Sequence, residues 1–234
     1  TNWTDVSKNI KGLPQGSWIP QIKASNKNKG EALLIANDYR RFNYTPYAFR
    51  TKDYGKNWER IVDEKDVRSF ALCILEDIEE PNLMFLGTDD GLYISIDAGN
   101  KWTKWTAGFP TVSVKDLLIH PRENDLIVAT HGRGVFKLDM DVMHETLSRD
   151  LATRDGDFFF DIPNAALPYL SDVRPGMNFR AGDKATISFW LNQASKVEIL
   201  IQNKDGETLA KFFQNASRGV NQYRWDLVTD SSNS

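Results

Sequence analysis

The amino-acid sequence predicts an all-β protein on three observations. One strand pattern recurs three times within the first 140 residues, a run of alternating strands follows after residue 184, and aromatic residues are frequent. The 234 residues include seven Trp, seven Tyr and thirteen Phe, residue types that are enriched in β-sheets. The repeat is the strongest of these signals, because internal self-similarity at a regular period determines the architecture.

Each copy of the repeat consists of an apolar strand, a polar turn and a second strand. The pairs are residues 31–37 with 47–53, 82–88 with 91–97, and 124–130 with 134–139. A strand is expected before each pair, at 18–23, 70–75 and 114–119, and a short closing strand after the first two, at 58–61 and 102–105. Four short strands per copy indicate β-propeller blades. Pro20 is expected to disturb its strand, and the turn of the first copy, residues 38–46, is the longest.

The turn before each closing strand has the form [Ser/Thr]-x-Asp-x-Gly-x-x-Trp. Its members are Thr51, Asp53, Gly55 and Trp58 in the first copy, and Ser95, Asp97, Gly99 and Trp102 in the second. In such a turn Asp accepts hydrogen bonds from backbone amides, and Gly supplies a positive φ. Trp folds back between strands and buries a large area. These residues are therefore predicted to be structural rather than catalytic.

This motif resembles the Asp-box of the bacterial neuraminidase repeat, which occurs in sialidases, sortilin-type propellers, xyloglucan-cleaving glucanases and a photosystem assembly factor. The resemblance implies a propeller but no single activity. Residues 1–150 also resemble, through Thr130-His-Gly-Arg-Gly134, the last blade of the bacterial sortilin-like "glycosyl hydrolase" group. The first residues, through Trp3, match the end of a further Asp-box, so the sequence is expected to begin inside a blade. Three blades do not close a ring, so further chain or a partner chain is expected to complete it.

We expect residues 1–140 to form the C-terminal blades, 141–172 a linker, and 173–234 a partial immunoglobulin-like β-sandwich. The expected strands are 185–191, 197–201, 208–213 and 219–226, with a hairpin turn at 203–207 and linker segments 158–163 and 167–170 docked on the sandwich. The pattern Gly-x-Asn-x-x-x-Trp-Asp ending at Asp226 resembles the immunoglobulin-like module at the ends of secreted bacterial proteins.

Composition excludes several classes of function. A net charge of −3 argues against a nucleic-acid binder, and no stretch is apolar for long enough to span a membrane. Cys73 is the only cysteine, so no internal disulfide forms, and its apolar neighbours indicate a buried side chain. The three histidines have no metal-binding spacing, and no phosphate-cradling loop is present, so we expect neither metal nor cofactor.

Two turns hold candidate functional residues. His131 and Arg133 would line one mouth of the propeller and contact a ligand, since a guanidinium can donate two parallel hydrogen bonds to a carboxylate. The alternative is that His131 only satisfies the backbone of its turn. Asp89 and Asp90 are the one carboxylate pair suited to glycoside hydrolysis; the alternative is a solvated turn. Sialidases need three arginines, a nucleophilic Tyr with a Glu, and a further acidic residue. We cannot identify this set of residues in the sequence.

The sequence therefore favours a secreted or cell-surface propeller scaffold that binds a protein, a peptide or a glycan. The location would be extracellular, cell-surface or periplasmic. One alternative is a glycoside hydrolase, sialidase-like or xyloglucanase-like, with most catalytic residues outside these 234. A second alternative is a structural subunit of a larger surface complex.

Overall fold

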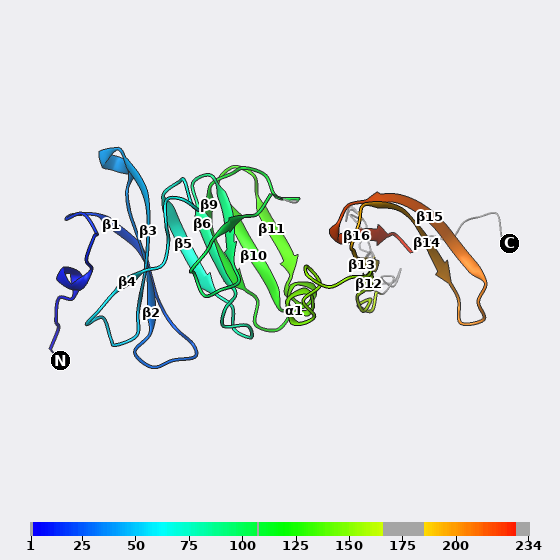
Figure 1. Cartoon of the computed structure of the whole chain (residues 1–234), viewed down its shortest axis with the longest axis horizontal. Helices are drawn as coiled ribbons and strands as arrows, with labels where there is room; N and C mark the ends of the chain where they lie inside the picture. Colours follow the sequence, from blue (N-terminus) through cyan, green and yellow to red (C-terminus); the bar gives the residue numbers. More distant parts are fainter. Residues whose placement is uncertain (1, 107, 166–184, 228–234) are drawn as a thin grey trace, which may run out of the picture. The chain divides into compact units, whose positions relative to one another are not determined.

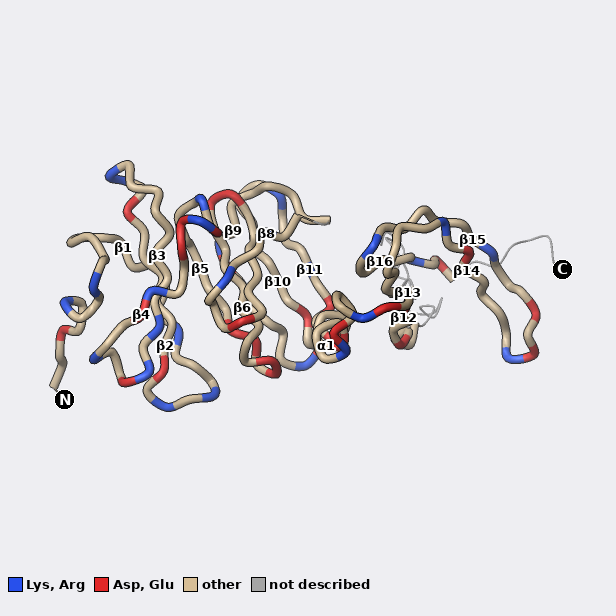
Figure 2. The backbone as a smooth tube through the Cα atoms, in the orientation of Figure 1, with Lys and Arg blue, Asp and Glu red and all other residues tan. Residues whose placement is uncertain are grey.

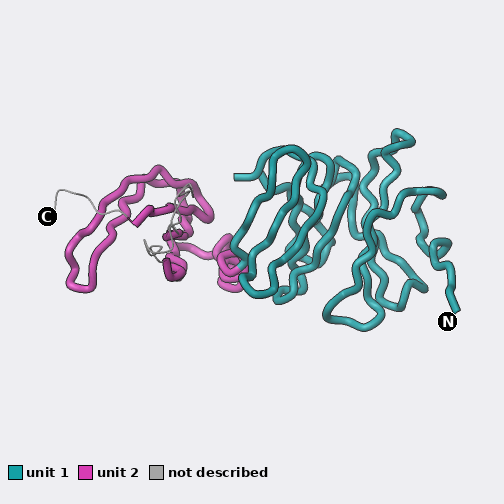
Figure 3. Tube along the Cα trace, turned by 180° about the vertical axis from the view of Figure 1, so that it is seen from behind, with its two compact units in different colours: residues 1–140 teal, residues 141–234 magenta. Residues whose placement is uncertain are grey.

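The computed structural model describes residues 2–106, 108–165 and 185–227, and it confirms an all-β fold (Figure 1). The chain divides into two compact units, residues 1–140 and 141–234 (Figure 3). Every sheet in the described part is antiparallel.

The first unit holds three sheets within its described residues, each a meander of neighbouring strands. The first sheet has the order β1 (Trp18–Ala24), β2 (Ala32–Asp38), β3 (Asn43–Thr51) and β4 (Glu59–Arg60). The second has β5 (Ala71–Glu76), β6 (Met84–Thr88), β7 (Gly91–Ser95) and β8 (Thr103–Lys104). The third has β9 (Val114–Ile119), β10 (Asp125–Thr130) and β11 (Val135–Asp139). The sheets stack in sequence order, with β5 against the first sheet and β9 against the second.

Three strands, not four, form the third sheet, in agreement with the closing strands expected only after the first two pairs. No Asp-x-Gly-x-x-Trp turn follows β11, and the chain instead enters helix α1 (Met140–Ser148). The loop predicted in the first copy, residues 38–46, is longer than the observed loop. Strand β3 begins at Asn43, because its pairing with β2 extends to the Asp38–Asn43 pair, and only a short 3-10 turn, η2 (Tyr39–Arg41), lies between them.

Apolar side chains fill the space between the first two sheets. Ile35 and Ala48 from the first sheet and Ile74 and Leu86 from the second belong to one buried cluster. A polar contact also crosses this interface, since the Ile74 amide donates to Gln21 Oε1 at 2.7 Å. Strand β1 shifts its register between Trp18 and Gln21, as expected at Pro20, which cannot donate to the ladder.

The second unit begins within α1, and its described residues form five strands in two sheets. One sheet has the order β12 (Phe158–Phe159), β13 (Ala185–Leu191) and β16 (Gly219–Trp225), and the other pairs β14 (Ser195–Gln202) with β15 (Thr208–Ala216). Leu151, Phe160 and Trp190 form a small core beside α1. The immunoglobulin-like module stays a prediction. The expected docking segment 167–170 and residues 173–184 of that module lie outside the described residues.

Charged residues of both signs alternate along the strands and loops of the first unit, without a basic stripe (Figure 2). Cys73 is buried as predicted, and burial, followed by the nearby Asp116 charge, raises its pKa to about 12. Its thiol therefore stays protonated at neutral pH. Over the described ranges, no helix has both the length and the apolar character that a bilayer crossing requires.

Candidate functional site

The three turns that join the middle strands of each sheet lie at one end of the first unit. Because each sheet repeats the same antiparallel order, the β2–β3, β6–β7 and β10–β11 turns all point the same way, upward in Figure 1. We call this surface, made of residues 38–43, 88–91 and 130–134, the turn end. Both pairs of candidate residues from the sequence lie on it.

Asp89 and Asp90 are neighbours on the β6–β7 turn, but their surroundings differ. Asp89 is exposed, whereas Asp90 accepts hydrogen bonds from Lys104 Nζ at 2.9 Å and from the Thr88 hydroxyl at 2.7 Å. The Tyr93 hydroxyl also lies 3.3 Å from Asp90 Oδ1. Burial, and then the charge of Asp90, raise the pKa of Tyr93. These contacts connect Asp90 to β8 and to its own turn.

His131 and Arg133 lie on the β10–β11 turn, and both side chains are exposed. The His131 amide donates to the Ser113 carbonyl at 2.9 Å, which fixes the backbone at the start of the turn. Gly132 and Gly134 have φ values of 87° and 76°, so the tight reversal uses a conformation that glycine adopts readily. Within the part of the chain that the structure describes, neither His131 nor Arg133 forms an ion pair, and the Arg133 guanidinium faces solvent.

At the opposite end, the turn after β3 is held by hydrogen bonds centred on Thr51 and Asp53. Thr51 Oγ1 accepts from the Gly55 amide at 2.9 Å and donates to Asp53 Oδ1 at 3.0 Å. Asp53 Oδ1 also accepts from the Asn57 amide at 2.8 Å. Hydrogen bonds from the Asn57 side chain, and then from its amide, lower the pKa of Asp53. The Asp53 carboxylate therefore accepts its hydrogen bonds from residues of its own turn.

The turn after β7 repeats this geometry. Ser95 Oγ accepts from the Gly99 amide at 2.8 Å, and Asp97 Oδ1 accepts from the Lys101 amide at 2.9 Å. Burial acts to raise the pKa of Asp97, but the Lys101 amide and the Ser95 hydroxyl outweigh it and hold the pKa below its usual value. The two turns therefore have the same local structure.

The tryptophans of the two turns also occupy matching positions. Trp102 is 3% exposed, and its Nε1 donates to the Ile61 carbonyl at 2.7 Å. Trp58 is partly buried against Leu34 and Phe49. Its Nε1 is buried as well, but it has no hydrogen-bond partner among the described residues.

The sequence did not single out the β2–β3 loop as a site, although it showed the loop to be the longest of the three. Arg40, Phe42 and Tyr44 are exposed there, and Phe42 and Tyr44 line a cleft of about 440 Å³. Two arginines and three aromatic residues within positions 39–44 were the available signal.

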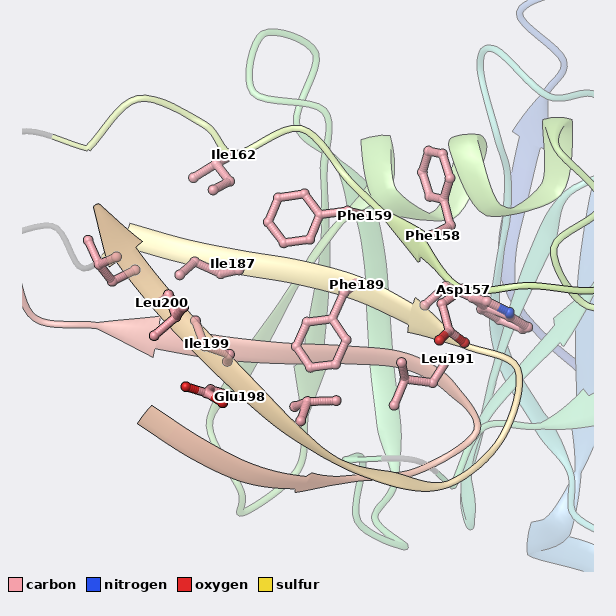
Figure 4. A pocket seen from close by; sticks show the side chains of 13 residues that line it. Asp157, Phe158, Phe159, Ile162, Ile187, Phe189, Leu191, Glu198, Ile199 and Leu200 are labelled. Atoms are coloured by element: carbon pink, nitrogen blue, oxygen red, sulfur yellow. The ribbon is translucent and has the colours of Figure 1, made fainter. Parts of the chain in front are cut away.

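A second cleft, of about 390 Å³, lies between the two sheets of the second unit (Figure 4). Apolar side chains from β13, such as Ile187 and Phe189, and from β14, such as Ile199, point into it. Glu198 at its rim is paired with Lys211. Facing sheets with an apolar space between them are the arrangement of a sandwich core, so the lining offers packing rather than chemistry.

Two sequence comparisons match part of this chain. Residues 47–156 match the Sortilin-Vps10 family, described as "Sortilin, neurotensin receptor 3". The vacuolar protein sorting/targeting protein 10 of Pyrenophora teres f. teres (strain 0-1) is 27% identical over 120 residues, which cover 50% of this chain and 7% of that protein. The aligned stretch is thus a small part of this relative.

Solved structures give more distant likenesses. The GH74 enzyme of Niastella koreensis is 12% identical with a TM-score of 0.42, over 85% of this chain and 30% of that one. YCF48 of Cyanidioschyzon merolae is 14% identical with a TM-score of 0.30, over 91% and 73%. Structural similarities with TM-scores this low carry no argument about the activity of this chain. The family match and the three stacked antiparallel sheets support a sortilin-like β-propeller.

Proposed function

We propose that this chain is part of a sortilin-like β-propeller scaffold that binds a protein or peptide ligand at the turn end. The match of residues 47–156 to the Sortilin-Vps10 family carries the proposal, because the family description names a receptor and the matching relative is named as a sorting protein. The matched stretch includes the β6–β7 and β10–β11 turns. The ligand would be met on the extracellular, cell-surface or lumenal side.

The exposed chemistry of the β10–β11 turn supports this role. Arg133 presents a guanidinium to solvent on a backbone whose start is fixed by the His131 amide. A planar guanidinium donates two parallel hydrogen bonds to a carboxylate, so an acidic side chain or a chain terminus of the ligand would pair with it. His131 would add a second polar contact beside it.

The test is binding of a displayed peptide library to the purified chain, followed by affinity measurement on the selected peptides. Arg133→Ala should weaken binding about ten-fold, since one exposed charged contact to a ligand contributes on the order of 1.4 kcal/mol. Arg122→Ala, at the opposite end on the β9–β10 turn, should leave the affinity unchanged. If no peptide is selected, or if both variants behave alike, the proposal is wrong.

Glycoside hydrolysis is the competing function, with Asp89 and Asp90 as its acid pair. The contacts of Asp90 with Lys104 and Thr88 support a structural role for this carboxylate instead. Incubation with xyloglucan oligosaccharides and with sialyllactose separates the two functions. The binding proposal expects no cleavage, whereas cleavage that Asp90→Asn abolishes in a folded protein would favour the hydrolase.

A further inference from the structure

The β2–β3 loop holds a large apolar side chain in an unfavourable position. Phe42 adopts a left-handed backbone with φ of 60°, a region that residues with a side chain rarely occupy. Phe42 ends the 3-10 turn η2, its amide donates to the Tyr39 carbonyl at 3.0 Å, and the residue is 84% exposed. The turn therefore holds an apolar ring in solvent, where a partner would contact it.

A continuous row of rings anchors this loop to the neighbouring sheet. Tyr39 stacks on Phe70 with ring centroids 4.6 Å apart, and Tyr44 lies 6.1 Å from the same ring. The Arg40 guanidinium lies over Tyr39 at 4.9 Å and over Trp18 at 5.5 Å. Trp18 and Tyr44 remain 59% and 54% exposed. The loop therefore presents a preformed surface of rings with a cation fixed on it.

The cleft beside this row offers room for a side chain. Its lining is mixed: Phe42, Tyr44, Pro46 and Val67 are apolar, whereas Asn43, Thr45, Glu64 and Arg68 are polar or charged. Its volume of about 440 Å³ exceeds that of one aromatic side chain. An anchoring residue of a partner can thus enter it while the rest of the partner crosses the ring row.

Positive charge exceeds negative charge around this surface, although the exposed Asp89 lies beside Phe70, with its amide donating to the Phe70 carbonyl at 3.3 Å. Two ion pairs neutralise part of the positive charge: Asp38 with Arg41, and Glu64 with Arg60. Arg40 and Arg68 have no ion-pair partner among the residues that the structure describes. Figure 2 shows basic residues at the tip of this loop. On a chain with net charge −3, this local excess is complementary to an acidic partner.

We infer that this aromatic–arginine surface, made of Trp18, Tyr39, Arg40, Phe42, Tyr44 and Arg68, binds an acidic peptide segment that carries one aliphatic or aromatic anchor. The anchor side chain occupies the cleft, and carboxylates of the peptide pair with Arg40 and Arg68. A guanidinium stacked on rings keeps its N–H edge free for such pairing. The inference rests on the proposed peptide-binding function and names the class of ligand.

The experiment measures fluorescence polarisation of short labelled peptides with the full chain. One panel carries Glu residues around a single Trp, Phe or Leu, and a matched panel carries Gln in place of Glu. Acidic peptides should bind at least about ten-fold more tightly than their Gln counterparts, and the difference should shrink as salt screens the charges. Arg40→Glu should reverse this preference.

Phe42→Gly separates binding from stability. Glycine relieves the left-handed strain, so the variant should be at least as stable as the parent chain in urea unfolding, yet bind acidic peptides several-fold more weakly. Tyr54→Gly is the matched control, because Tyr54 is also an exposed aromatic residue with positive φ but lies at the opposite end. Arg122→Glu is the control for charge reversal. Neither control should change the affinity.

The outcomes distinguish this inference from the function on which it rests. If both panels bind but Arg40→Glu and Phe42→Gly behave like their controls, the surface assignment is wrong and the peptide-binding function stands. If no peptide binds the parent chain, the function itself is contradicted. If an oligosaccharide binds in place of peptides and Phe42→Gly weakens it, the surface is a glycan site and the peptide assignment is wrong.

Discussion

Trp58 and Trp102 occupy the same position of the repeated turn, but only the indole N–H of Trp102 has a hydrogen-bond partner among the described residues. Glycines precede both, and a Cβ added at Gly99 would lie 3.3 Å from Ile61, while one at Gly55 would lie 3.4 Å from Val6. Val6 is therefore the counterpart of Ile61 in the preceding segment. The motif predicted that both rings fold back between strands, but its spacing contains no information about which carbonyl each indole reaches.

This difference predicts unequal costs of removing the two indole N–H groups. Trp102→Phe leaves the buried Ile61 carbonyl without its partner, so it should destabilise the first unit by about 1–3 kcal/mol beyond the lost packing. Trp58→Phe removes an N–H that has no partner among the described residues and should cost less. Urea unfolding of both variants measures the difference. An equal or larger loss of stability for Trp58→Phe would contradict the hydrogen bond assigned to the Trp102 indole.

The turn aspartates predict a loss of stability in acid. Hydrogen bonds hold the pKa of Asp53 and of Asp97 below the usual value, so both are more acidic in the folded chain than in the unfolded chain. Their contribution is therefore present above the unfolded pKa, near 4, and is lost as pH falls through the lower folded pKa. Unfolding measured from neutral pH downward should show this decline, and Asp97→Asn should make it shallower. If the stability of Asp97→Asn falls as steeply with decreasing pH as that of the parent chain, the lowered pKa of Asp97 is contradicted.

At the scale of elements, the strands are what the sequence predicted best. Alternation and the repeat located every strand of the first unit within a few residues, because one face of each sheet must be buried. The polar links between sheets were not predictable, since they join residues far apart in sequence. Arg50 is an example: it lies on β3, pairs with Glu31 and donates to the Ala98 carbonyl of the next sheet.

The close approach of the second and third sheets gives a prediction for Gly87 on β6. A Cβ at this position would lie 2.4 Å from Cys73 Sγ and 2.7 Å from Val114 Cγ1. Gly87→Ala should therefore destabilise the first unit by about 1–3 kcal/mol through overpacking. Adding Cys73→Ala removes the sulfur and should restore part of the loss, which a double-mutant cycle in urea measures. Strict additivity of the two substitutions would contradict this contact.

The candidate site was less predictable than the strands. His131, Arg133, Asp89 and Asp90 were chosen because polar residues cluster on turns, and the structure brings them to one end of the unit. Whether they act on a ligand stays a prediction. The ring row through Phe70 was not visible in the sequence, because Phe70 follows Tyr39 by thirty-one positions and meets it only when the sheets stack.

At the scale of the whole molecule, the two units have separate cores. Apolar side chains such as Ile74 and Leu86 fill the first, whereas Phe160 and Trp190 belong to the second. Calorimetry of the full chain should therefore show two transitions. Gly87→Ala should lower only one of them, and Phe160→Ala, which empties a buried site at a cost of about 3–5 kcal/mol, should lower only the other. Both transitions moving together in either variant would show one cooperative core.

The binding face is tested most directly by hydrogen–deuterium exchange of the full chain with and without a selected peptide. The account predicts slower exchange at the turn end, in residues 38–43, 88–91 and 130–134, and unchanged exchange in the opposite turns at 52–58 and 96–102. Protection confined to those opposite turns, or to the second unit, would contradict the turn end as the ligand-binding surface.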